Sequence, residues 1–408
     1  RSVGNFIGPD EIGAINVVLP IAFFISALGL AIGVGGGSII SRALGANNPS
    51  LANRTFGNQI TLTFLLTAAL AVVGLVFTET LIPMFGGKGE LYGLAKIYYQ
   101  IVLYGVPIQG LVMMGNNVMR AEGKPRNAMI AMIIPSVTNL LMDYILIVHY
   151  DFGMAGAAWA TVSSYILSVV YIGWYYLSGT SQVRVRWRYL KLRWRVIKEV
   201  IALGTVTLAR QAMVSVTYLM LNNILFSLGG ETSVTVYGII GRMLMFALFP
   251  VIGVTHGFLP IAGYNYGARL YVRVKETIWK AILAACGLGL LVFLFIGFYP
   301  ETIVSAFTQD ATLLEKTPNA MRIVFAATPI IGIQLIGAAY FQAVGKAVPA
   351  LLLTLTRQGF FFIPLLFILP NYYGELGVWL SFPLSDLIST IVTGLYMRRE
   401  VSRKLLVK

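Results

Sequence analysis

The stretch PIQGLVMMGNNVMRAEGKPRNA at residues 107–128 decides the fold class, because the chain repeats its pattern as PIIGIQLIGAAYFQAVGKAVPA at residues 329–350. The two stretches match without a gap at an offset of 329 − 107 = 222 residues, and they share a proline, a Gly-Lys pair and several small residues. The same offset pairs Gly8 with Gly230, Gly45 with Gly267 and Ala46 with Ala268. A repeat of two hydrophobic halves is typical of secondary transporters, whose substrate path runs between the halves.

The amino-acid composition is that of a membrane protein built from helices. Apolar residues make up 57% of the chain and charged residues 11%, whereas soluble domains carry about 25% charged residues. Apolar stretches at this density predict several helices that cross a bilayer. The single cysteine, Cys286, excludes a disulfide framework and a thiolate metal site, and His149 and His256 lack metal-ligand spacing. We therefore expect no metal and no cofactor.

Eleven apolar segments are long enough to be membrane helices. They span residues 11–44, 50–84, 91–120, 125–148, 154–178, 196–228, 232–264, 272–299, 312–343, 347–369 and 375–398. The repeat pairs Arg1 with Asn223, which lies late in the segment 196–228. We therefore expect one further helix before residue 1, and twelve helices in all.

The predicted fold is all-α, with two bundles of six helices joined by a linker. The N-terminal bundle is expected at 1–178, a basic linker at 179–195 and the C-terminal bundle at 196–408. Six crossings separate Pro107 from Pro329, an even number that gives both repeats the same orientation. The bundles should then be related by a pseudo-two-fold axis along the membrane normal.

Lysine and arginine are concentrated in alternate loops, which sets the expected orientation. The positive-inside rule places these loops in the cytoplasm, and they account for the net charge of +14. The densest run, at residues 184–198, interleaves basic residues with Trp187, Tyr189 and Trp194. Nucleic-acid binding is one interpretation of this run, but a cytoplasmic linker at the level of the lipid headgroups fits a membrane protein better. We expect membrane lipid, and no nucleic acid, as a partner.

Motifs on several of these helices resemble those of one transporter family. They are GVGGGS at 33–38, RALGA at 42–46, MRAEGKPR at 119–126, NLLMD at 139–143, GAAWAT at 156–161, PIAGYNYGA at 260–268 and RQGFFFIP at 357–364. Over essentially the whole chain, the sequence resembles the MATE family (multidrug and toxic compound extrusion), and most of all its bacterial DinF-like branch. The resemblance implies a V-shaped pair of six-helix bundles that exports organic cations or other drug-like molecules in exchange for H⁺ or Na⁺. We expect a monomer in the bacterial cytoplasmic (inner) membrane.

A candidate site for the coupling ion lies in the first bundle. Asn139 and Asp143 are four residues apart and share one helical face. Asp143 should lie about 8 Å from the outer end of its helix, and Thr161 should reach a similar depth on the next helix. Oxygen ligands suit Na⁺, and a desolvated carboxylate suits H⁺. A structural role for Asp143 is the alternative. The resemblance implies that these positions surround an essential aspartate of the helix before residue 1.

The second bundle departs from the pattern of the sodium-coupled branch of this family. That branch has a glutamate in the segment matching 196–228 and an aspartate in the segment matching 312–343, and this sequence has neither acid at those depths. Arg357 and Asp386 lie at similar depths on adjacent segments, which predicts a structural ion pair. Arg210, Arg242 and Arg322 are expected to be unpaired at membrane depth. They are expected either to pair with backbone carbonyls or to bind anionic groups. The second alternative keeps open a lipid-linked or anionic cargo, as in the flippase relatives of this family.

Polar and flexible side chains on the expected helices are candidates for a substrate cavity. They are Asn116, Asn117, Gln59, Gln211, Gln334, Met213 and Met243. Methionine surfaces suit promiscuous binding, although ordinary packing is the alternative for each of these residues.

Other functional classes fit the sequence less well. No paired-histidine site or activated serine indicates a membrane enzyme, and no Gly-Lys-Ser/Thr phosphate loop indicates an ATP-driven pump. A channel stays open as an alternative, but a two-fold repeat favours alternating access.

Overall fold

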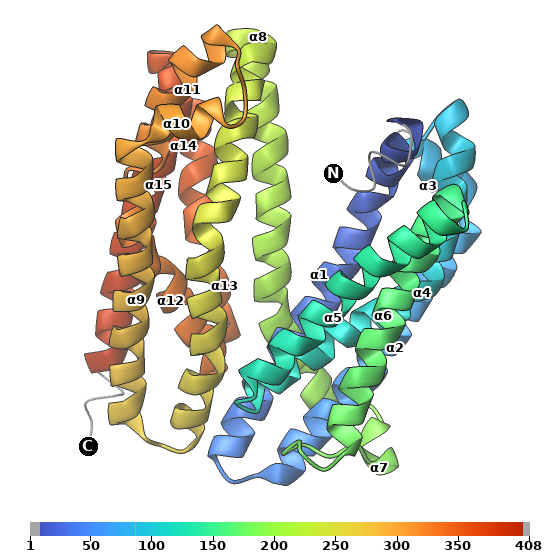
Figure 1. Ribbon diagram of the computed structural model, residues 1–408. Helices are drawn as coiled ribbons and strands as arrows, with labels where there is room; N and C mark the ends of the chain where they lie inside the picture. The colour runs from blue at the N-terminus through green and yellow to red at the C-terminus, as the bar shows by residue number, and fades with distance from the viewer. Residues whose placement is uncertain (1–8, 86, 403–408) are drawn as a thin grey trace. The chain divides into compact units, whose positions relative to one another are not determined.

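The chain forms helices throughout the part that the computed structural model describes, residues 9–85 and 87–402 (Figure 1). The first half contains α1 (Pro9–Gly45), α2 (Pro49–Val76), α3 (Thr78–Met84), α4 (Glu90–Ala121), α5 (Pro125–Asp143), the π-helix η2 (Tyr144–His149), α6 (Gly153–Leu177) and α7 (Trp187–Leu190). The second contains α8 (Trp194–Gly267), α9 (Tyr271–Phe298), α10 (Pro300–Ser305), α11 (Ala311–Val324), the 3₁₀ turn η3 (Thr328–Ile330), α12 (Ile331–Ala343), α13 (Ala347–Leu355), the π-helix η4 (Thr356–Phe362), α14 (Ile363–Tyr373) and α15 (Glu375–Glu400).

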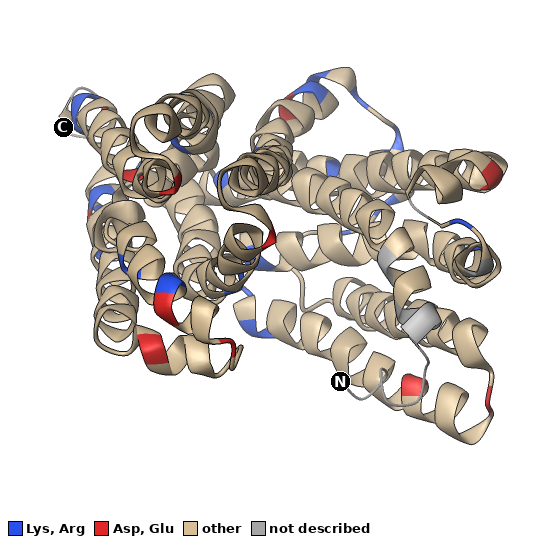
Figure 2. Ribbon diagram, turned by 90° about the horizontal axis from the view of Figure 1, so that it is seen from above, with Lys and Arg blue, Asp and Glu red and all other residues tan. Residues whose placement is uncertain are grey.

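The helices have the length and composition of membrane spans. In the described residues, ten helices are long and apolar enough to cross a bilayer, and most of the helical ribbon carries no charged residue (Figure 2). The longest, α8, breaks at Gly230, whose φ of 65° and ψ of −154° are open essentially to glycine alone. Dividing α8 there gives the eleven segments that the sequence predicts, and the all-α membrane fold class is confirmed.

The 222-residue repeat is visible in the bounds of the helices. Adding 222 to the bounds of α2 gives those of α9. Turns recur as well: Asn47 has φ 52° and Arg269 has φ 58°, while Gly123 has φ 77° and Gly345 has φ 83°. Gly8, which pairs with Gly230, lies outside the described residues. The repeat in sequence is therefore a repeat of helices and turns.

Two expected helices are interrupted in the second half. The segment predicted at 312–343 breaks into α11, η3 and α12 near Pro329, whereas its counterpart α4 continues through Pro107. The segment predicted at 347–369 extends to Tyr373 and contains the π-helix η4. Both differences follow from local backbone geometry that hydropathy does not report.

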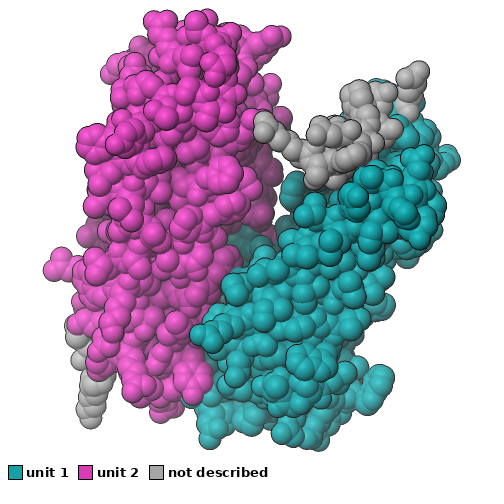
Figure 3. Space-filling model, in the orientation of Figure 1, with its two compact units in different colours: residues 1–207 teal, residues 208–408 magenta. Residues whose placement is uncertain are grey.

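The chain divides into two compact units, residues 1–207 and 208–408 (Figure 3). The first unit holds α1 to α7 together with the start of α8. The predicted limits of the bundles, at residues 178 and 196, stay a prediction. The linker and the beginning of α8 cluster with the first unit because side chains of that unit bind them closely.

The linker is held by side chains of α2, near the end of that helix that is predicted to be cytoplasmic. Asn58 donates from Nδ2 to the carbonyl oxygen of Tyr189 at 3.0 Å and accepts from the backbone N–H of Arg193 at 2.7 Å. Thr61 donates to the carbonyl oxygen of Leu190 at 2.8 Å. A Cβ on Gly57 would lie 2.4 Å from the Tyr189 carbonyl oxygen, so only glycine allows this approach. The linker is thus a docked part of the first unit.

Candidate functional site

A pocket of about 300 Å³, with several neutral polar side chains in a mainly apolar wall, lies within the first unit between α4, α5 and α6. Its walls are formed by Val112, Met113, Asn116, Ala131, Met132, Pro135, Ser136, Asn139, Thr161, Ser164 and Tyr165. Three of the predicted site residues line it: Asn116 from the substrate-cavity set, and Asn139 and Thr161 from the coupling-ion set. The fold therefore brings together residues that are 45 positions apart, from Asn116 to Thr161 (161 − 116 = 45).

Hydrogen bonds position the three predicted side chains. Asn139 donates from Nδ2 to Thr161 Oγ1 at 3.4 Å, and Thr161 donates to the carbonyl oxygen of Ala157 at 3.1 Å. Asn116 donates from Nδ2 to the carbonyl oxygen of Ala128. The side-chain amides of Asn116 and Asn139 thus each donate a hydrogen bond to an acceptor of the protein. Their oxygens are then left to bind a cation or a donor group of a ligand.

Asp143 lies one helical turn beyond Asn139, at the last residue of α5, and is half-buried. The π-helix η2 begins at the next residue, and π-helical insertions are frequent at functional sites. Asp143 does not line the pocket itself. Tyr98 of α4 lies between the pocket and Asp143, because it interacts with the side chain of Thr161 and lies within electrostatic range of Asp143.

The sequence interpretation missed two tyrosines and two serines of this region. Tyr98 and Tyr165 lie within electrostatic range of each other, and Ser136, Ser164 and Tyr165 line the pocket. Their helical spacing gave a weak signal: Ser136 lies three residues before Asn139, and Tyr165 lies four residues after Thr161. Tyr98 had no such signal, since only the packing of α4 against α6 brings it there.

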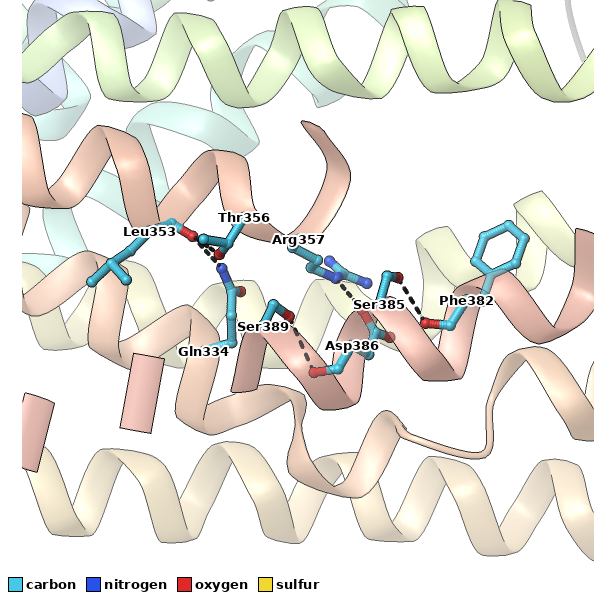
Figure 4. A network of polar contacts seen from close by, with 8 residues as sticks. All are labelled: Gln334, Leu353, Thr356, Arg357, Phe382, Ser385, Asp386 and Ser389. Atoms are coloured by element: carbon cyan, nitrogen blue, oxygen red, sulfur yellow. Dashed lines mark hydrogen bonds and ion pairs between the residues drawn. The ribbon is translucent and has the colours of Figure 1, made fainter. Parts of the chain in front are cut away.

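The second unit holds the ion pair that the sequence predicts. Arg357 of η4 points toward Asp386 of α15 (Figure 4), and its Nε lies 2.6 Å from Asp386 Oδ1. Nearby, Gln334 of α12 is buried and donates from Nε2 to the carbonyl oxygen of Leu353 at 3.0 Å. A buried charge is tolerated when it is paired in this way.

The ion pair occupies the positions that form the pocket in the first unit. At the 222-residue offset, Arg357 corresponds to Pro135 and Asp386 to Ser164 (357 − 222 = 135; 386 − 222 = 164), and both of these line the pocket. Gln334 corresponds in the same way to Val112, another wall residue. The two repeats therefore differ in chemistry at the same place in the fold: an uncharged, mainly apolar pocket in one, a guanidinium and a carboxylate in the other.

A family model described as MatE matches residues 1–145 and 207–368, which is more than half of the chain. The chain belongs to the MATE family. It is 27% identical over 392 residues to the multidrug export protein MepA of Staphylococcus aureus (strain N315), covering 95% of this chain and 86% of MepA. It is 26% identical to an outward-facing multidrug resistance MATE family transporter of the MOP superfamily, with a TM-score of 0.91, 98% of this chain and 90% of that chain covered. A MATE structure in the bent conformation gives a TM-score of 0.93 at 26% identity over 98% of this chain and 90% of that chain. The DinF-like branch stays a prediction.

The other predicted cavity residues of this MATE protein lie in varied surroundings. Gln59 is fully buried and donates to the carbonyl oxygen of Ile32 at 2.7 Å, so its amide joins α2 to α1. Asn117 donates to the Met113 carbonyl oxygen at 2.8 Å and faces Gly33 of α1. Gln211 is exposed, and Met213 and Met243 are partly buried in the second unit. None of these five belongs to the pocket walls, and their role in a cavity stays a prediction.

The three remaining arginines of the MATE chain do not form one class. The expectation that Arg322 is unpaired is wrong: its Nη2 lies 3.0 Å from Glu301 Oε1, and both side chains are exposed. The reason is that α11 is a separate short helix, so Arg322 lies in its last turn beside α10. Arg242 is exposed on α8. Arg210 is partly buried and lies within electrostatic range of Arg357.

Proposed function

We propose that this protein is a secondary active multidrug exporter of the bacterial cytoplasmic membrane, which exchanges organic cations or amphiphilic drugs for H⁺ or Na⁺ by alternating access. Membership of the MATE family supports this proposal, as does similarity to MepA of Staphylococcus aureus, a multidrug export protein, over 86% of its length. The single observation that carries the proposal is the pocket of Asn116, Asn139 and Thr161 beside Asp143. Both repeats lie in one chain, so we propose that the monomer transports.

Asp143 is the residue that we propose as carrier of the driving ion. A half-buried carboxylate within a candidate span is a functional group by default, because the membrane makes an unused charge costly. It can take up H⁺ on its own, or bind Na⁺ with the oxygens of Asn139 and Thr161 as neutral ligands. Export against a gradient requires that binding of the ion and binding of the drug oppose each other. A higher external concentration of the driving ion should therefore promote drug release.

The test is drug transport by Asp143→Asn in reconstituted vesicles with an imposed H⁺ or Na⁺ gradient. The variant keeps the size of the side chain but loses the charge, so export should fall at least roughly tenfold while expression and melting temperature stay near those of the parent protein. Asn139→Ala and Thr161→Ala should weaken export less, since each removes one neutral group. Glu79→Gln is the matched control, because Glu79 is also an acid of the first unit but is exposed and paired with Lys96. Full gradient-driven export by Asp143→Asn would refute the assignment.

The same vesicles separate an exporter from a channel. An exporter accumulates the drug against its own gradient when the driving ion flows, and it stops when that ion gradient is collapsed. A channel would carry the drug only down its gradient, whatever the state of the ion gradient.

A second candidate function is export of an amphiphile that carries an anionic group. Arg210 favours it, because in the described residues this partly buried side chain has no hydrogen bond or ion pair.

A further inference from the structure

The second unit carries more positive than negative charge in the middle of its helices. Asp386 lies twelve residues into α15 (386 − 375 + 1 = 12). Arg357 lies inside the composite helix Ala347–Tyr373, and Arg210 lies inside α8. These spans therefore hold one carboxylate and two guanidinium groups, and the carboxylate is paired with Arg357. In a medium of low dielectric constant, an uncompensated cation is costly, so the imbalance calls for a physical explanation.

Arg357 has unused hydrogen-bonding capacity. Its Nε is bonded to Asp386 Oδ1 at 2.6 Å, and no other hydrogen bond links it to the residues that the structure describes. The Arg357 side chain is 19% exposed, whereas the Asp386 side chain is 9% exposed. Asp386 thus accepts from Nε of Arg357, and the two Nη groups remain as donors for a further acceptor.

Arg210 is a second arginine close to Arg357. It is within electrostatic range of Arg357. The elements that carry the two arginines are in contact, because a Cβ on Gly359 of η4 would lie 3.6 Å from Sδ of Met213 of α8. Met213 lies three residues after Arg210, and residues three apart on a helix share a face. The face of α8 that carries Arg210 therefore packs against η4, the element that carries Arg357.

We propose that Arg210 and Arg357 form a binding site for an anionic group of an amphiphile, namely a carboxylate, phosphate or sulfonate, with Asp386 orienting Arg357. The planar donor fork of arginine matches these oxyanions and binds them through paired charge-assisted hydrogen bonds. A bound anion would offset the excess positive charge that the protein alone leaves uncompensated.

The repeat shows that this site is specific to the second half of the chain. At the 222-residue offset, the positions of Arg357 and Asp386 are Pro135 and Ser164 in the first unit. The first unit therefore offers neutral oxygens and Asp143, which suit cations, and the second offers guanidinium groups, which suit anions. For transport, which rests on the proposed export function, the substrates would then include anionic and zwitterionic amphiphiles.

Binding of three probes with one fluorophore tests the site. The full-length protein in phosphatidylcholine nanodiscs is titrated with dansylglycine, which is anionic, dansylamide, which is neutral, and dansylcholine, which is cationic, and energy transfer from tryptophan is followed. The parent protein should bind dansylglycine more tightly than dansylamide. Arg210→Gln should weaken the binding of dansylglycine roughly tenfold or more and leave the binding of dansylamide unchanged, because only the anion loses charge-assisted hydrogen bonds. Arg210→Lys should give an intermediate affinity, since it keeps the charge and loses the fork.

Arg357 is tested in the double variant Arg357→Gln/Asp386→Asn, because the single change would leave the Asp386 carboxylate buried without its cation. This variant should also lose affinity for dansylglycine. The matched control is Arg322→Gln, which removes an exposed arginine of the same unit that is paired with Glu301, and it should bind all three probes like the parent. Equal dansylglycine affinity in Arg210→Gln and the parent would overturn the proposal. Equal loss of dansylamide and dansylglycine would overturn it as well, since it would indicate damaged packing.

Two further arms identify the source of the anion. Competition by phosphatidylglycerol added to the nanodiscs, lost in Arg210→Gln, supports a lipid headgroup as occupant. Competition by inorganic phosphate, also lost in Arg210→Gln, supports a small soluble anion. The binding assay does not depend on the driving ion. The anion site is therefore tested by dansylglycine binding and the Asp143 assignment by gradient-driven export, so failure of one is distinguishable from failure of the other.

Discussion

Arg357 and Asp386 show which part of the site can be predicted from single residues. Their depths follow from counting residues along two helices, so an ion pair could be expected, and the structure has it at 2.6 Å. Arg322 shows the limit of this counting. It lies within an apolar segment in sequence, but the helix breaks after Val324 and leaves Arg322 exposed beside Glu301. Residue depth is predictable only where the helix is continuous.

Arg357→Ala should destabilise the protein more than the double change Arg357→Ala/Asp386→Ala. The single change leaves Asp386, which is buried, without its cation, at a cost of about 3–5 kcal/mol. The double change removes both charges, so the free energy of unfolding should fall by less. The measurement is the thermal midpoint of the purified protein in detergent. A double variant that melts below Arg357→Ala would contradict this expectation.

Glu122, between α4 and α5, should make stability depend on pH. It is 4% exposed, and burial raises the pKa of its carboxyl, although hydrogen bonds from Ser181, Gln182 and Val183 lower it. A raised pKa in the folded state means that stability is fully present below the ordinary value of 4.5 and is lost as pH rises through the raised value. The thermal midpoint of the parent, relative to Glu122→Gln, should therefore fall as pH rises from about 5 to about 8. Parallel curves for the two proteins would show that Glu122 stays ionised.

At the level of elements, helix number and type follow from the sequence, while the interruptions do not. Hydropathy and the repeat predict the spans, since membrane helices must satisfy their own backbone hydrogen bonds. The π-helices η2 and η4 depend on one extra residue within a helical turn, which no apolar pattern records. The π-helix η2 begins directly after Asp143, and η4 contains Arg357, so each charged candidate lies in or next to one of the least predictable elements.

Glycine determines how closely α1 can approach α8. A Cβ on Gly35 would lie 2.3 Å from the carbonyl oxygen of Val200 and 2.8 Å from the backbone nitrogen of Gly204. Gly35→Ala should therefore force the two helices apart and cost about 1–3 kcal/mol, because backbone atoms cannot move aside as a side chain can. Gly173→Ala, on α6, is the matched control, since a Cβ there meets nothing within 4 Å. The thermal midpoint should fall for Gly35→Ala and stay level or rise for Gly173→Ala. Equal midpoints would mean that this contact does not limit the packing.

At the scale of the whole molecule, the repeat predicts the order of the helices. The sequence differences between the two halves account for their different candidate sites. The outer limits of the spans in the second half lie close to those of the first plus 222, although the spans are interrupted at different places. What the repeat could not predict is where one half has changed. Pro135 and Ser164 form part of a pocket, and their counterparts Arg357 and Asp386 form an ion pair. The pocket itself needs three helices to meet, which is a tertiary fact beyond the pattern of any one segment.

The link between the repeats is expected to depend on Asn58. Its side chain is buried and bonds the carbonyl oxygens of Tyr189 and Lys191 and the backbone N–H of Arg193, at 3.0, 3.2 and 2.7 Å. The linker is rich in arginine and lysine, so trypsin can cut it wherever it opens. Asn58→Ala leaves these backbone groups without their protein partner, and each lost bond costs about 1 kcal/mol.

Trypsin should therefore cleave the linker of Asn58→Ala several times faster than that of the parent, at equal protein and protease concentrations, because cleavage follows the population of the open form. Drug export should fall with it if the docked linker transmits motion between the repeats. Asn371→Ala is the matched control, since the Asn371 amide is exposed and, among the described residues, bonds only the carbonyl oxygen of Phe367, one turn away on its own helix. Cleavage of the linker at the parent rate in Asn58→Ala would mean that the remaining contacts, which include those of Asn53, Thr61 and Glu122, are enough to hold it.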